Sequence, residues 1–136
     1  MGKYIGSLED FIRLFSSSLG TNAVQTISKK FKTECKFKEL ELQGECSSYT
    51  EFEAAHRRGY ERKDIMKYVL YRLQTGNKID YELFQKEIAS NWNPSNLNID
   101  FDTFLTEFKQ FHKNHLNEII IPLCRYHHDV YDKRKK

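Results

Sequence analysis

The sequence predicts an α+β fold in a single domain of 136 residues. Several segments place apolar residues three or four positions apart, which is typical of helices. Two short segments have a pattern that predicts strands. A third strand is predicted where β-branched residues dominate, over 119–123. Hydrophobic residues make up 39% of the chain and aromatic residues 14%, which supplies one packed core and argues against a disordered chain.

The first predicted elements are two helices. Ser7, followed by Asp10, can cap the first helix, and its apolar residues recur at helical spacing: Leu8, Phe11, Ile12 and Phe15. Gly20 ends it, and Thr21–Lys32 forms the second helix, with three lysines near its end, where cations suit the helix dipole. The pair resembles a helix-turn-helix, but no third helix follows, so packing is the preferred interpretation.

Strands and further helices follow. Phe37–Gln43 alternates leucine with glutamate, which predicts a strand, and Thr50–Arg57 is a second strand candidate. Arg62–Thr75 is a predicted helix that Gly76 stops. Asp80 and Asp100 are predicted N-caps of two more helices. The remaining elements are a polar loop over Asn91–Asn98, a strand over Ile119–Leu123 and a C-terminal helix over Cys124–Lys136.

Composition narrows the class of protein. No apolar run approaches 18 residues, so no membrane span is expected, and the N-terminus lacks the features of a signal peptide. Three scattered cysteines suit a reducing compartment, so we expect a cytoplasmic protein. The net charge is only +3, but two basic segments (46–79 and 119–136) flank an acidic one (80–118). If the basic segments meet in space, they form a patch able to neutralise phosphates.

Two local patterns carry the candidate chemistry. The first is Glu53-Ala54-Ala55-His56-Arg57, in a predicted strand. The second runs from Ile119 through Pro122-Leu123-Cys124 to His127-His128 and Asp132. His128 and Asp132 are four residues apart in the predicted helix, so both side chains lie on one face and can hold one divalent cation.

These two blocks resemble the HNH nucleases, also called the His-Me finger or ββα-metal family. Glu-Ala-Ala-His is similar to the first strand of that motif, and Ile-Pro-Leu-Cys-x-x-His-His-x-x-Tyr-Asp to its second strand and metal-binding helix. The resemblance covers about 25 residues. It implies a ββα-metal finger and the metal-assisted hydrolysis of phosphodiester bonds.

The resemblance also implies roles for individual residues. His56 matches the general base that deprotonates the attacking water, and Asn117 is the candidate for the Asn that steadies the loop behind the base. His128 and Asp132 match the metal ligands, with Mg²⁺ or Mn²⁺ as the expected cation. Ala55 stands where the family often has a ligand. Glu53, two positions earlier on the same strand face, is the candidate to replace it, with water as the alternative.

The two halves of the motif are far apart in this chain. Sixty residues separate His56 from Asn117, which predicts a helical insertion into the finger. The domain then divides into N-terminal helices (1–36), a finger (37–57 and 119–136) and the insertion (58–118). Because its second half is acidic, the insertion is not expected to lie on DNA; it would buttress the site, restrict entry or bind a partner.

Cationic side chains next to the motif are candidates for nucleic-acid contacts: Arg57, Arg58, Arg62, Lys63, Arg125 and Lys133. Cys124 and His127 have zinc-ligand spacing, and Cys46 is a third candidate ligand. A structural zinc is not expected, because Gln43 stands where a partner for Cys46 would be. His112 and His115 are expected to flank the aromatic stripe rather than bind metal.

The sequence therefore predicts a metal-dependent DNA endonuclease, as in restriction or another defence system. Its partner would be DNA, with RNA as the alternative substrate, and a homodimer is expected if both strands are cut. Two non-enzymatic hypotheses stay open: a nucleic-acid-binding module that keeps the finger without cutting, and a zinc-stabilised interaction domain.

Overall fold

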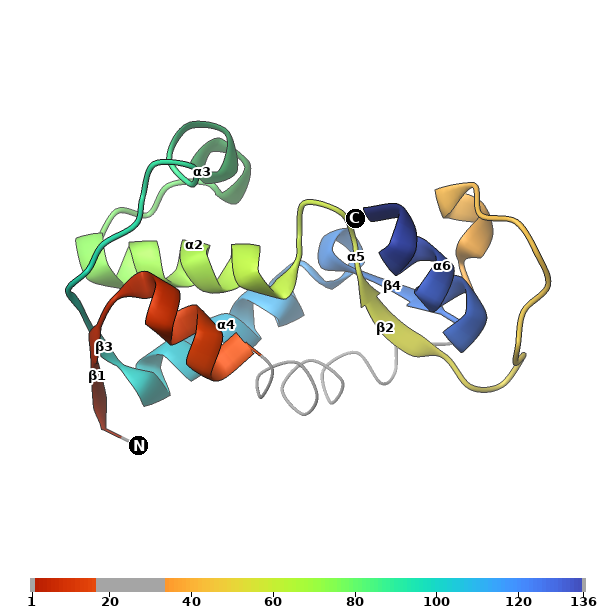
Figure 1. The fold of residues 1–136 in the computed structure, drawn as a ribbon, viewed down its shortest axis with the longest axis horizontal. Helices are drawn as coiled ribbons and strands as arrows, with labels where there is room; N and C mark the ends of the chain where they lie inside the picture. The colour runs from red at the N-terminus through yellow and green to blue at the C-terminus, as the bar shows by residue number, and fades with distance from the viewer. Residues whose placement is uncertain (1, 17–33, 136) are drawn as a thin grey trace.

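The computed structural model describes residues 2–16 and 34–135 and shows an elongated α+β molecule with two parts. One part is a mainly helical body, and the other is a smaller unit built from two strands and the C-terminal helix (Figure 1). In the described residues, no helix is long and apolar enough to cross a membrane.

Three helices, each with a capping residue at its start, build most of the body. Helix α2 (Arg62–Thr75) begins with a capping box between Glu61 and Asp64 and ends at Gly76, whose φ of 74° a side chain would disfavour. Helices α3 (Tyr81–Glu87) and α4 (Phe101–Asn114) begin at Asp80 and Asp100, whose carboxylates accept backbone N–H bonds. All three helix starts agree with the sequence prediction.

A two-stranded antiparallel sheet closes the far end of the body. Strand β1 (Lys3–Gly6) pairs with β3 (Leu97–Asp100), with Tyr4 opposite Ile99. The sequence predicts neither strand, and residues 91–98 are expected to form a loop. Each strand is only four residues long, and its partner lies about 95 positions away in the sequence (Tyr4 opposite Ile99), so neither carries a local signal.

The N-terminal residues and the insertion share one core. Residues 8–16 are helical, and Ser7 caps them by accepting the Asp10 backbone N–H. Phe11 is fully buried and meets Phe104 of α4 edge-to-face, with ring centroids 4.9 Å apart. The N-terminal helix and the insertion are therefore one packed body. The predicted second helix, Thr21–Lys32, lies outside the described residues.

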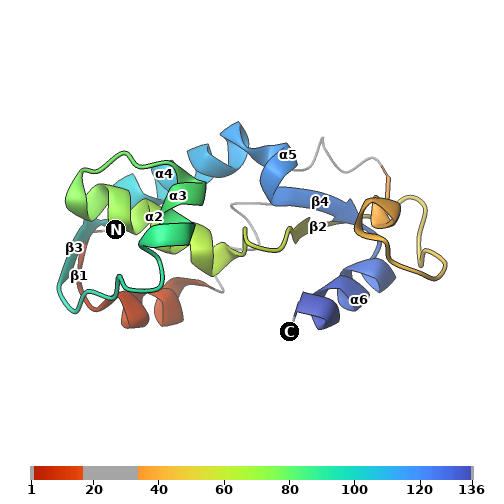
Figure 2. The same ribbon diagram turned by 90° about the horizontal axis from the view of Figure 1, so that it is seen from above.

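The smaller unit is a strand pair followed by a helix, and we call it the finger unit. Strand β2 (Glu53–His56) pairs antiparallel with β4 (Ile120–Leu123), and α6 (Arg125–Lys135) packs against both (Figure 2). The short helix α5 (Leu116–Ile119) leads into β4. A second, smaller core lies within the finger unit: Leu42, Ala55, Ile121, Leu123 and Tyr131.

One predicted strand is wrong. Phe37–Leu40 is a 3-10 helix, η2, and Glu41 after it is left-handed, with φ 57°. The alternation of leucine and glutamate there has no neighbouring strand to pair with. Instead, Phe37 stacks on the His127 ring of α6, with centroids 4.1 Å apart, and the segment covers that helix.

Candidate functional site

The strand pair and α6 border a cleft that is lined by five of the eleven predicted site residues. It has a volume of about 390 Å³ and is lined by His56 from β2, by His128 and Asp132 from α6, and by Arg62 and Lys63 from the start of α2. These residues come from three separated stretches of the chain, and the pairing of β2 with β4 brings them together.

Two carboxylates hold the His128 ring. Glu53 Oε1 lies 2.8 Å from Nδ1, and Asp132 Oδ2 lies 3.4 Å from Nε2. The two acidic groups therefore meet opposite nitrogens of one imidazole. Asp132 and Nε2 are spaced to share one cation, because metal–ligand bonds of about 2.0–2.2 Å separate neighbouring ligand atoms by roughly 3 Å. Glu53 is placed to orient the ring from its other nitrogen, which is a common arrangement behind metal-bound histidines.

His56 lines the cleft and also contacts α4. Alternation along β2 puts Ala55 into the core of the finger unit, and puts His56 on the opposite face, toward α4. There its Nε2 lies 3.2 Å from Nε2 of the fully buried His112. Burial lowers the pKa of His112 to about 4.

Asn117 lies in the short helix α5 and is exposed. No hydrogen bond joins it to His56 in the described part of the chain. The His56 ring contacts His112 of α4.

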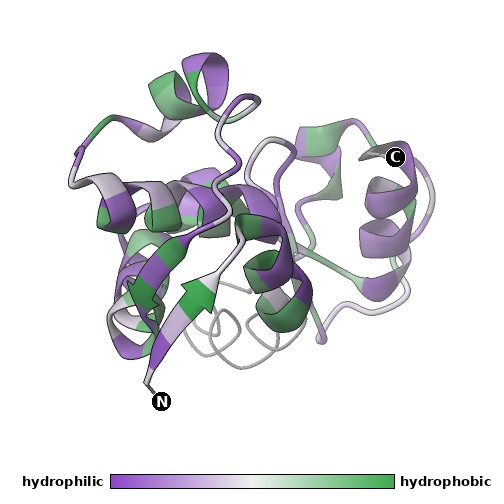
Figure 3. Ribbon diagram, turned by 60° about the vertical axis from the view of Figure 1, so that its left-hand side comes forward, coloured by the Kyte–Doolittle hydropathy of each residue, from purple (hydrophilic) through white to green (hydrophobic). Residues whose placement is uncertain are grey.

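The predicted cationic contacts are spread over the surface. Arg62 and Lys63 line the cleft, and the Arg62 guanidinium donates to the backbone carbonyl of Ser16. Arg57 instead pairs with Glu39 at 3.6 Å, and Arg58 lies beside the end of α6. Arg125 and Lys133 are exposed on α6, which is hydrophilic along most of its length (Figure 3).

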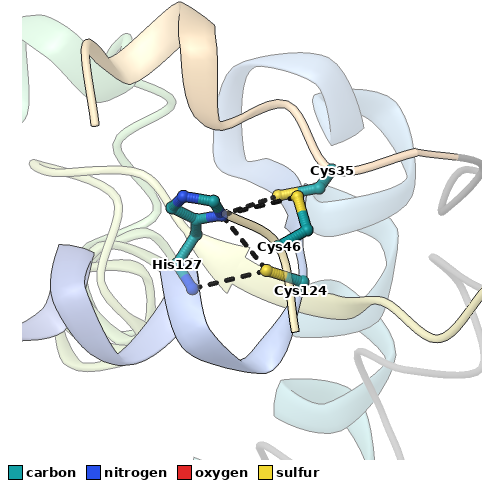
Figure 4. Close-up of side chains that lie close together, drawn as sticks. All are labelled: Cys35, Cys46, Cys124 and His127. Atoms are coloured by element: carbon teal, nitrogen blue, oxygen red, sulfur yellow. Dashed lines mark hydrogen bonds between the residues drawn. The ribbon is translucent and has the colours of Figure 1, made fainter. Parts of the chain in front are cut away.

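A second site lies at the start of α6, where three cysteines surround one histidine (Figure 4). His127 Nδ1 is 3.1 Å from Cys124 Sγ, 3.5 Å from Cys35 Sγ and 3.7 Å from Cys46 Sγ. In a tetrahedral zinc site the nitrogen and sulfur ligands stand about 3.6 Å apart, given bonds near 2.05 and 2.3 Å. The four side chains can therefore hold a metal ion of the zinc type.

The surroundings of His127 fit that role. Its Nε2 lies 3.2 Å from the carbonyl oxygen of Gln43 and 3.1 Å from that of Gly44. Carbonyls only accept, so Nε2 carries the proton, and the lone pair on Nδ1 faces the three sulfurs. Burial raises the pKa of Cys124, but N–H bonds from His127 and Ser47 outweigh it and lower the pKa to about 6.

This cluster runs against the expectation that no structural zinc is bound, which rested on a missing fourth ligand. Cys35 offers a fourth ligand atom beside those of Cys46, Cys124 and His127, and the backbone carbonyl oxygen of Gln43 lies 3.2 Å from Nε2 of His127. Sequence spacing gave no signal, because Cys35 and Cys46 do not form a closely spaced pair.

No known protein family, no curated protein and no solved structure matches this chain.

Proposed function

We propose that the protein is a metal-dependent endonuclease that hydrolyses phosphodiester bonds of DNA at the cleft between β2, α6 and the start of α2. The observation that supports this most is the meeting of His56, His128 and Asp132 at that cleft, beside Arg62 and Lys63. A base, a pair of metal ligands and cations for phosphate are the groups that such a reaction needs.

Each residue has a distinct role in this proposal. His128 Nε2 and Asp132 hold a divalent cation, Mg²⁺ or Mn²⁺, which when bound stabilises negative charge on the phosphate and on the departing 3′ oxygen. Glu53 orients His128 through Nδ1. His56 accepts the proton of the attacking water. Lys63 is exposed at the rim of the cleft and neutralises phosphate.

The test is the cleavage of supercoiled plasmid with Mg²⁺ or Mn²⁺. His56→Ala should lower the rate about 10²–10⁴-fold, the usual contribution of a general base. His115→Ala is the matched control, because His115 lies outside the cleft and pairs with Glu118. Equal activity of the His56 variant and the wild type would remove His56 from the mechanism.

A second candidate is a nucleic-acid-binding module without cleavage activity. The observation that favours it is Ala55, which is fully buried and offers no ligand from the strand. Retention of a short duplex in a gel-shift assay, with no nicking under any divalent ion, would favour this module.

We also propose that the Cys35–Cys46–Cys124–His127 cluster holds a structural Zn²⁺ that fixes the start of α6. Metal analysis of the purified protein should find one zinc per chain. Protein free of zinc that keeps its thermal stability after chelator treatment would exclude this role.

A further inference from the structure

The contact between His56 and His112 joins the finger unit to the helical body. His56 ends β2, and His112 lies in the last turn of α4. Their Nε2 atoms are 3.2 Å apart, and the rings are nearly perpendicular, at 87°. His112 has no exposed surface, and its ring packs on Phe108 with centroids 4.5 Å apart.

Proton positions at this contact follow from the partners of His112. Its Nδ1 lies 2.9 Å from the backbone carbonyl oxygen of Phe108. That oxygen only accepts, so Nδ1 carries a hydrogen. With its pKa lowered to about 4 by burial, His112 is neutral at pH 7 and has one ring proton. Its Nε2 therefore presents a lone pair to His56.

We propose that His112 is a positioning residue that fixes the tautomer of His56. Two lone pairs facing each other at this distance would repel, so Nε2 of His56 carries the hydrogen and donates it to His112. The lone pair of the neutral His56 ring is then on Nδ1, which becomes the basic atom.

The last step rests on the function proposed above. When water attacks the phosphate, its oxygen forms a new bond to phosphorus, its O–H bond breaks, and the proton goes to Nδ1 of His56. The bond from phosphorus to the 3′ oxygen breaks, and that oxygen takes a proton from solvent, which leaves a 5′-phosphate and a 3′-hydroxyl. The resulting imidazolium still donates from Nε2 to His112, now through a charge-assisted hydrogen bond, which is stronger than the neutral one. The insertion thus contributes to catalysis a side chain that does not contact the substrate.

The tautomer is measured directly by the ¹⁵N chemical shifts of His56 in the full chain near pH 8, assigned with the His56→Ala variant. We expect the protonated nitrogen to be Nε2. A proton on Nδ1 would overturn the proposal. This measurement needs no activity, so an absence of plasmid cleavage would exclude the nuclease function while the tautomer still decides the role of His112.

Two variants separate positioning from packing. His112→Leu fills the buried space without an acceptor, whereas His112→Gln keeps an acceptor oxygen on a side chain of similar reach. The Leu variant should mix the His56 tautomers and slow cleavage about 10- to 100-fold, as loss of an orienting partner does. The Gln variant should restore the Nε2–H tautomer and most of the rate. Equal tautomer populations in wild type and His112→Leu would overturn the proposal, even if Leu lowers stability.

Discussion

His127 and His128 are neighbours in the chain, but their rings belong to different sites. Nδ1 of His127 faces the sulfurs of the cysteine cluster, whereas Nδ1 of His128 contacts Glu53 at 2.8 Å, beside the cleft. Successive residues of a helix point about 100° apart, so one turn of α6 can serve both sites. We therefore expect a disturbance of the first site to reach the second.

Loss of His127 should affect metal content and cleavage together. His127→Ala removes one of four ligands, so the zinc content should fall from one per chain toward none, and the thermal midpoint should drop. Cleavage should disappear as well, because the start of α6 is no longer fixed. Metal analysis and thermal unfolding check this, with His56→Ala as the control that should keep its zinc. A His127 variant with full zinc content would contradict the prediction.

Asp132→Ala should raise the Mg²⁺ or Mn²⁺ concentration needed for half-maximal cleavage, because one ligand is lost. Excess metal should restore part of the rate, whereas His56→Ala should not recover, since added metal supplies no proton acceptor. Titration of metal against the cleavage rate measures both. As a contrast, Glu53→Gln keeps an acceptor for His128 Nδ1 and should shift the titration less than Glu53→Ala. An unchanged metal dependence in Glu53→Ala would leave Glu53 without a role at the cation.

The free energy of unfolding should fall as the pH is lowered through the range in which His112 gains a proton. Its pKa is about 4 in the folded protein and about 6.5 when exposed, so the unfolded chain binds the proton first as pH falls. The free energy of unfolding should therefore decrease from about pH 6.5 to pH 4, by up to about 3 kcal/mol from this residue, and level off below. Urea unfolding at a series of pH values measures the slope. His112→Gln should flatten it, and an equally steep slope in that variant would assign the effect to other groups.

Because residues 8–16 and α4 share one core, shortening the Phe104 side chain should lower the stability of the protein strongly. Phe104→Ala should destabilise the protein by about 3–5 kcal/mol, because the ring is fully buried against Phe11. Leu14→Ala is the control, since Leu14 is 57% exposed, and it should change stability by less than about 0.5 kcal/mol. Similar losses in both variants would show that residues 8–16 do not pack as described.

The features that the sequence predicted well are local ones. The caps at Asp80 and Asp100 and the stop at Gly76 depend on neighbouring residues only, so their signal is complete within a few positions. The i, i+4 spacing of His128 and Asp132 likewise needs only the helix, and the structure places the pair 3.4 Å apart.

The features that it missed depend on distant partners. Strand β1 exists because Tyr4 meets Ile99, and Cys35 is a candidate ligand because the chain folds over the start of α6. His112 lies on the aromatic face of α4, and from the sequence it is expected to pack there. The pairing of β2 with β4 brings His56 to it. Such contacts have no signature in linear spacing.

The antiparallel pairing of β2 with β4 also sets an order of assembly. His56 and His128 can line one cleft only after residues 120–135 have joined β2, because these residues form β4 and α6. The body between the strands is built from earlier residues, and its local helices form fast, whereas joining distant strands is slow. Any activity of the cleft therefore depends on this slower joining of β4 to β2.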